Sequence, residues 1–127
     1  MKTVLVVDDE YLIRWALFEG LKDRFNVLTA CSVDRAVEVL SQMKVDAVVT
    51  DLRMPGRNGM ELVELLRTHN PEVKIFIVTA YGSDEIIDRA FALDVEGYIR
   101  KPFKINLIRD MLECHMTGPP RADAGVA

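Results

Sequence analysis

The chain has 127 residues, half of them hydrophobic and 28% charged, with a net charge of −4 at pH 7. This length suits one domain with a buried core, and the composition is ordinary for a globular protein. The acidic balance offers no basic stripe for phosphates, which argues against direct nucleic-acid binding by this chain. No apolar run approaches the ~20 residues that span a bilayer, so we expect a cytoplasmic protein without membrane contact.

The predicted elements follow from short apolar runs that alternate with segments of helical periodicity. In chain order they are the strand Thr3–Val7, helix Tyr11–Arg24, strand Val27–Ala30, helix Val33–Met43, strand Ala47–Thr50, helix Gly59–Asn70, strand Ile75–Thr79, helix Asp84–Leu93, strand Gly97–Ile99 and helix Ile105–Cys114. Such alternation implies right-handed crossovers between parallel strands. The predicted fold class is α/β: a five-stranded parallel sheet, doubly wound as a flavodoxin-like (βα)5 three-layer sandwich.

Two features lie outside this pattern. After Cys114 the sequence has no apolar period and concentrates Gly, Pro and Ala, so we expect a domain over residues 1–114 and a flexible tail or linker start over 115–127. The two cysteines, Cys31 and Cys114, are too few and too far apart for a disulfide framework or a metal knuckle. We expect both to be reduced and used for packing.

Charged side chains follow three of the predicted strands directly. Asp8 and Asp9 follow the first strand, Asp51 the third, and Lys101 lies just beyond the fifth. The carboxyl ends of parallel strands line one crevice, where three carboxylates repel one another unless cations compensate them. Hard oxygen ligands favour Mg²⁺, which takes one or two carboxylates together with a phosphate and waters. Lys101 is the expected counter-charge on a phosphoryl oxygen.

Each of these residues also has a structural explanation. A single Asp after a strand is usually a turn former or a helix cap, and a single Lys is usually a solvated charge. The joint pattern is what favours function, because Thr79 adds a hydroxyl at the end of the fourth strand. Acid pair, acid, hydroxyl and lysine together occupy four strand ends.

With these motifs in place, the sequence resembles a response-regulator receiver domain of two-component signalling, with a CheY-like fold, from Lys2 to about Cys114. The matching segments are Val6-Val7-Asp8-Asp9-Glu10, Thr50-Asp51-Leu52-Arg53-Met54-Pro55-Gly56 with Gly59, Val78-Thr79-Ala80 and Lys101-Pro102-Phe103. Each segment is weak evidence by itself, and the set is highly specific. Two stretches, Leu12-Ile13-Arg14-Trp15 and Lys101-Pro102-Phe103, further resemble receivers of NtrC-type transcriptional activators.

The resemblance implies a role for each matching residue. Asp51 matches the phosphoacceptor that a histidine kinase or phosphotransfer protein loads. Asp8 and Asp9 match the acid pair that places Mg²⁺, with Asp51 and the backbone carbonyl of Arg53 as further ligands. Lys101 matches the phosphoryl-binding lysine, and the family implies a cis bond to Pro102.

The resemblance also implies a switch and its partners. Thr79 matches the hydroxyl that turns towards the phosphoryl group, and Tyr98 the aromatic ring that changes orientation with it. The implied function is a phosphorylation-dependent switch for an output domain or a downstream protein, with no substrate besides its own phosphoryl group. The apolar stripe of the last predicted helix suggests a phosphorylation-dependent homodimer.

Three other classes compete with this interpretation. A flavodoxin-like cofactor binder would need a hydroxyl- or glycine-rich phosphate loop where this chain has Asp8, Asp9 and Glu10. A Mg²⁺-dependent aspartyl-phosphate phosphatase would place an Asp-x-Asp motif there, whereas these aspartates are adjacent. A non-phosphorylated receiver-like interaction module would not need the intact acid set.

Two groups of side chains beside the expected site stay open at this point. Tyr11, Trp15 and Phe18 form a stripe on the first helix that is either buried at its flank or exposed for a partner. Arg53 and Tyr81 border the phosphoryl group by the family layout, so bulky side chains there should hinder water. Gly56 and Gly59 are expected to serve a turn after Asp51.

Overall fold

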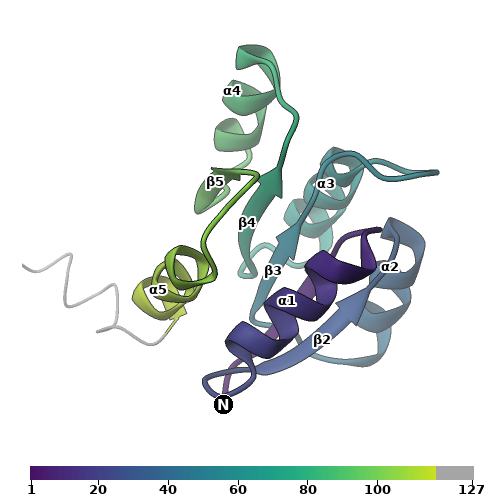
Figure 1. Cartoon of the computed structure of the whole chain (residues 1–127). Helices are drawn as coiled ribbons and strands as arrows, with labels where there is room; N and C mark the ends of the chain where they lie inside the picture. The colour runs from purple at the N-terminus through teal and green to yellow at the C-terminus, as the bar shows by residue number, and fades with distance from the viewer. Residues whose placement is uncertain (117–127) are drawn as a thin grey trace, which may run out of the picture.

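A computed structural model describes residues 1–116 of the chain as alternating strands and helices (Figure 1). In chain order these are β1 (Thr3–Val7), α1 (Tyr11–Leu21), β2 (Asn26–Ala30), α2 (Val33–Gln42), β3 (Ala47–Thr50), α3 (Gly59–His69), β4 (Lys74–Thr79), α4 (Asp84–Ala92), β5 (Gly97–Arg100) and α5 (Ile105–Met116). Within these 116 residues, no helix is long and apolar enough to cross a membrane.

The five strands form one parallel sheet in the order β2-β1-β3-β4-β5. The chain moves outward from β1 to β2 and then returns to the other side of β1 for β3. Strand order therefore reverses between β1 and β3, and the carboxyl ends of strands beside such a reversal border the ligand crevice of open α/β sheets. The predicted doubly wound fold is confirmed.

Alternate residues of each strand supply two separate cores. Val4 and Val6 of β1 pack with Leu17 of α1 and Leu112 of α5 on one face. Leu5 and Val7 belong to the other core, which α2, α3 and α4 cover through a set that includes Val33, Ala36, Leu62, Leu66 and Ala90. The helices thus divide two against three, and α1 crosses in front of the sheet in Figure 1.

The predicted element boundaries differ most at the ends of the first and last helices. Helix α1 stops at Leu21 rather than Arg24, because the chain turns there and the amides of Arg24 and Phe25 both bond to the Leu21 carbonyl. That turn buries the Phe25 side chain in the α1 core. Helix α5 continues to Met116, two residues into the segment predicted as a tail, and residues 117–127 of that segment lie outside the described part.

Local signals at the helix starts account for several boundaries. Ser32 and Ser83 accept hydrogen bonds from the third residues of α2 and α4. Asn58 and Glu61 form a reciprocal capping box at the start of α3, a signal that the sequence interpretation missed. The expectation that both cysteines pack in the interior is wrong, because Cys31 and Cys114 are free and exposed.

Candidate functional site

The site lies where β1, β3, β4 and β5 end. Val7 of β1 is in register with Thr50 of β3, so Asp8 and Asp51 follow their strands at the same level. Backbone hydrogen bonds continue the ladder one step further, from the Asp51 amide to the Val7 carbonyl and from the Lys101 amide to the Thr79 carbonyl. The sheet therefore brings the predicted side chains to one edge.

The three predicted carboxylates form one cluster. Oxygens of Asp8, Asp9 and Asp51 all lie within 4.8 Å of one another. Asp8 and Asp51 are buried, with 2% and 4% of their surface exposed, whereas Asp9 is exposed to solvent. An all-oxygen donor set with one open side fits Mg²⁺, which retains waters and needs few protein carboxylates.

Lys101 compensates two of these charges. Its Nζ lies 2.8 Å from Asp8 Oδ2 and 2.8 Å from Asp51 Oδ2, and the lysine side chain is only 11% exposed. Glu10 adds a longer contact of 3.5 Å from its Oε1. The peptide bond between Lys101 and Pro102 is cis, as predicted.

The electrostatics of the cluster follow from burial and pairing. Burial raises the pKa of Asp8 above its ordinary value, although the hydrogen bonds from Lys101 and from the Glu10 amide oppose this. Burial by itself would lower the pKa of Lys101, but hydrogen bonds to Asp51 and Asp8 outweigh it and raise that pKa. The lysine is therefore charged at neutral pH, and burial makes ionisation of Asp8 less favourable than that of a free aspartate.

Backbone groups orient the Asp51 carboxylate. Its Oδ1 accepts hydrogen bonds from the amides of Leu52 at 2.6 Å and Arg53 at 3.2 Å, while Oδ2 faces Lys101. Gly59 begins α3 directly against this segment, and a methyl group at position 59 would overlap the Asp51 carbonyl oxygen. Gly59 thus permits a close approach, not the turn that was expected, whereas Gly56 does adopt a left-handed conformation at φ +83°. The Arg53 carbonyl stays a predicted metal ligand.

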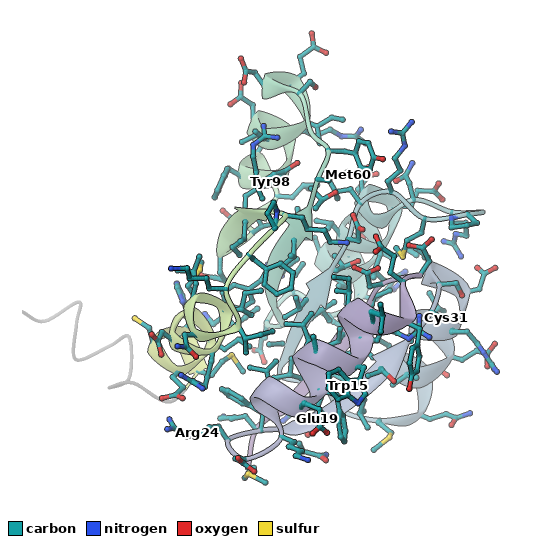
Figure 2. The ribbon with its side chains drawn as sticks, viewed as in Figure 1. Trp15, Glu19, Arg24, Cys31, Met60 and Tyr98 are labelled. Atoms are coloured by element: carbon teal, nitrogen blue, oxygen red, sulfur yellow. The ribbon has the colours of Figure 1, made fainter. Side chains whose placement is uncertain are left out.

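Thr79 at the end of β4 and Tyr98 on β5 both contact the loop between β4 and α4. The hydroxyl oxygen of Thr79, which is fully buried, accepts a hydrogen bond from the Tyr81 amide at 3.2 Å. Tyr98 donates its hydroxyl to the Tyr81 carbonyl at 2.6 Å, and Figure 2 shows it on β5 near α4. Burial raises the pKa of Tyr98 despite the nearby Arg100 charge, so its hydroxyl remains a donor at neutral pH.

The structure also places the Arg53–Tyr81 pair and the aromatic stripe of α1. The Arg53 guanidinium stacks 4.1 Å from the centre of the Tyr81 ring, a contact that links the loops after β3 and β4. On α1, Tyr11, Trp15 and Phe18 are 66%, 54% and 38% exposed, so the stripe faces solvent rather than the core. Figure 2 shows Trp15 projecting from α1.

Comparison with known proteins then decides the family. The response regulator receiver domain family matches residues 4–113, which is most of the chain. The chain belongs to this family. The receiver domain is a phosphorylation-dependent signalling module, and the phosphatase alternative is not favoured by any of these matches.

Individual relatives support the same family and differ in what accompanies the receiver. Sporulation initiation phosphotransferase F of Bacillus subtilis is 29% identical over 89% of this chain and 92% of its own length. Response regulator protein FleR of Pseudomonas aeruginosa is 31% identical over 91% of this chain but only 24% of its own length. A cyclic di-GMP phosphodiesterase of Thermotoga maritima is 35% identical, and the chain spans 29% of it.

A solved structure extends the likeness to the fold. The response regulator protein TrrA of Thermotoga maritima, solved in complex with Mg²⁺-BeF, superposes with a TM-score of 0.79 at 31% identity. The match covers 89% of this receiver and 97% of TrrA. The structural superposition and the sequence comparison therefore agree on the same receiver fold.

Proposed function

We propose that Asp51 of this receiver accepts a phosphoryl group from a phosphohistidine on a sensor kinase or a phosphotransfer protein. The observation that carries the proposal is the position of Lys101, whose ammonium group lies 2.8 Å from both Asp8 and Asp51 at the end of the sheet. A largely buried lysine side chain between two buried carboxylates provides positive charge at the point where a phosphoryl group would arrive.

The chemistry needs little from the protein besides position and charge. An oxygen of Asp51 attacks phosphorus and forms the O–P bond, while the P–N bond of the donor breaks and its electron pair returns to the imidazole. The two amides on Asp51 Oδ1 hold the carboxylate in one orientation during this step. Lys101 would exchange part of its contact with Asp51 for a phosphoryl oxygen.

Mg²⁺ fits the same site as a cofactor. Asp8, Asp9 and Asp51 would hold it, together with the Arg53 carbonyl that the family layout implies. The ion would neutralise negative charge that gathers on the phosphoryl oxygens. The exposed Asp9 is the ligand through which it would enter from solvent.

The proposed readout runs through Thr79 and Tyr98. A phosphoryl oxygen adds a strong acceptor near the end of β4, towards which the Thr79 hydroxyl would turn. The space that this movement leaves would admit the Tyr98 ring, which now lies against the α4 side of the core. Phosphorylation would thus shift the population of two existing arrangements.

We further propose partners for this receiver. The exposed α1 stripe of Tyr11, Trp15 and Phe18 would dock the phosphodonor, because aromatic side chains are enriched at interface centres. Several longer relatives are named transcriptional regulatory proteins, and others are named NtrX-like response regulators. A regulator of the NtrC type is therefore the proposed setting. The receiver would act in the cytoplasm on no substrate besides its own phosphoryl group.

Acetyl phosphate and Mg²⁺, followed by intact-mass measurement, test the proposal. Wild-type protein should gain one phosphoryl group, and EDTA should prevent the gain. Asp51→Asn should gain none, whereas Asp46→Asn, which changes a carboxylate at the opposite end of β3, should behave as wild type. Undiminished phosphorylation of Asp51→Asn would refute the assignment.

A further inference from the structure

The loop between β4 and α4 is held by two side chains of strand β5. The Tyr98 hydroxyl donates to the Tyr81 carbonyl at 2.6 Å, and Arg100 Nη2 donates to the Gly82 carbonyl at 3.2 Å. Residues 98 and 100 are two apart, so they project from the same face of β5. The strand therefore contacts two consecutive carbonyls of the loop.

The same loop also contacts the switch hydroxyl. The Tyr81 amide donates to the Thr79 hydroxyl oxygen, while the Tyr81 carbonyl accepts from Tyr98. The Thr79 side chain cannot move away from this amide unless the bond breaks or the loop follows, and the bonds from β5 oppose movement of the loop. A chain of hydrogen bonds thus joins Thr79 to β5 through residues 81 and 82.

Glycine at position 82 makes this arrangement possible. Its φ is +137°, in the region that side chains disfavour. A methyl group there would also overlap the Tyr98 hydroxyl oxygen. The Tyr98 hydroxyl therefore lies in the space that a side chain at position 82 would fill.

We propose that Arg100 is a positioning residue that holds the loop, and through it Thr79, in the arrangement that does not engage a phosphoryl group. Arg100 acts through the Gly82 carbonyl, not by contact with Asp51. Movement of the loop towards the phosphoryl group would break the bond, so the bond favours the resting state. This inference rests on the proposed function of Asp51 and Thr79.

Charge and hydrogen bonding by Arg100 predict opposite results. Loss of a positive side chain near an anion site weakens anion binding through electrostatics. Loss of a bond that exists only in the resting state tightens binding of any ligand that selects the other state. The direction of the change therefore separates the two roles.

The experiment titrates beryllofluoride, a phosphoryl mimic, into Mg²⁺-loaded protein by calorimetry. Arg100→Met keeps the aliphatic stem and removes both charge and donor, and we expect roughly three- to fivefold tighter binding. Arg100→Lys keeps charge and donor and should return towards wild type. Arg109→Met removes the same charge from α5, where Arg109 bonds Asn106, and should not tighten binding.

Gly82→Ala gives a second and independent measurement. The new methyl group would displace the Tyr98 hydroxyl and would also strain the loop at φ +137°. Both effects loosen the resting arrangement, so beryllofluoride should again bind more tightly than to wild type. If Arg100→Met binds the mimic equally or more weakly, the positioning role is wrong while the Asp51 site stands. If wild type fails to bind the mimic, the proposed function itself is wrong, and the two failures are distinguishable.

Discussion

The acidic crevice and the β4–α4 loop lie beside each other and are held in different ways. In the crevice, the charged side chains pair with one another, because Lys101 contacts both Asp8 and Asp51 at the strand ends. In the loop, side chains of β5 hold backbone carbonyls of residues 81 and 82. The crevice is therefore suited to charge and chemistry, and the loop to a movement that breaks few bonds.

The largest expected effect comes from the crevice. Lys101→Met should reduce the rate of Asp51 phosphorylation by acetyl phosphate about 10²–10³-fold, the cost of removing one positioned donor from a transition state. The measurement is the initial rate by intact mass at saturating Mg²⁺. Lys104→Met, an exposed lysine three residues along, should retain the wild-type rate. Equal rates for the two variants would remove Lys101 from the chemistry.

These two regions also mark what the sequence could predict. Asp8, Asp51 and Lys101 follow apolar runs, and parallel strands place their carboxyl ends together. The sequence therefore predicted which residues meet in the crevice. The fold followed from the same alternation, and boundaries failed mainly where a turn such as that at Leu21 depended on burying Phe25.

The loop was harder to predict. Arg100 reads as a solvated charge at the end of a strand, and no sequence pattern marks a hydrogen bond from an arginine to a distant backbone carbonyl. The same holds for Arg67, whose guanidinium reaches carbonyls of residues 71, 73, 93 and 94. By contrast, the Asn58–Glu61 capping box had a readable signal.

The next largest effect should be on homodimerisation through helix α5, on the same side of the molecule as the β4–α4 loop. Helix α5 buries Ile108 and Leu112 but leaves Leu107 49% exposed, so only a flank of its apolar stripe is available for association. Beryllofluoride with Mg²⁺ should strengthen homodimerisation about 5–150-fold, the range of typical allosteric coupling. Analytical ultracentrifugation measures it, with Leu107→Asp expected to abolish the gain and Leu12→Asp on α1 to preserve it. A strict monomer in both states would favour a different protein as the partner.

A smaller effect is expected where the two regions touch. Arg53 and Tyr81 stack at 4.1 Å across the two loops and should hinder water attack on phosphorylated Asp51. Arg53→Ala and Tyr81→Ala should each lose the phosphoryl group roughly two- to fivefold faster, in line with a cation–π contact of about 0.5–1 kcal/mol. If the stack is the barrier, the double variant should match the single ones. Unchanged half-lives would show that neither side chain excludes water.

The smallest effect concerns stability without metal. Because burial raises the pKa of Asp8, its ionisation costs folded-state stability above that pKa and costs nothing below the unfolded value. In EDTA at neutral pH, Asp8→Asn should therefore melt about 3–6 °C higher for each kcal/mol relieved. The advantage should vanish below about pH 3.9. Asp9→Asn, at an exposed position, is the control, and a lower melting temperature for Asp8→Asn would show that Lys101 fully compensates the carboxylate.

The most direct test of the account asks whether the crevice controls the loop. Nuclear magnetic resonance of protein with labelled tyrosines follows Tyr98, which Tyr98→Phe assigns, while Tyr11 on α1 is an internal reference. With Mg²⁺ and beryllofluoride, the Tyr98 ring signal should shift in wild type as its hydroxyl leaves the Tyr81 carbonyl. It should not shift in Thr79→Ala at saturating mimic. An unmoved Tyr98 signal in saturated wild type would contradict the account.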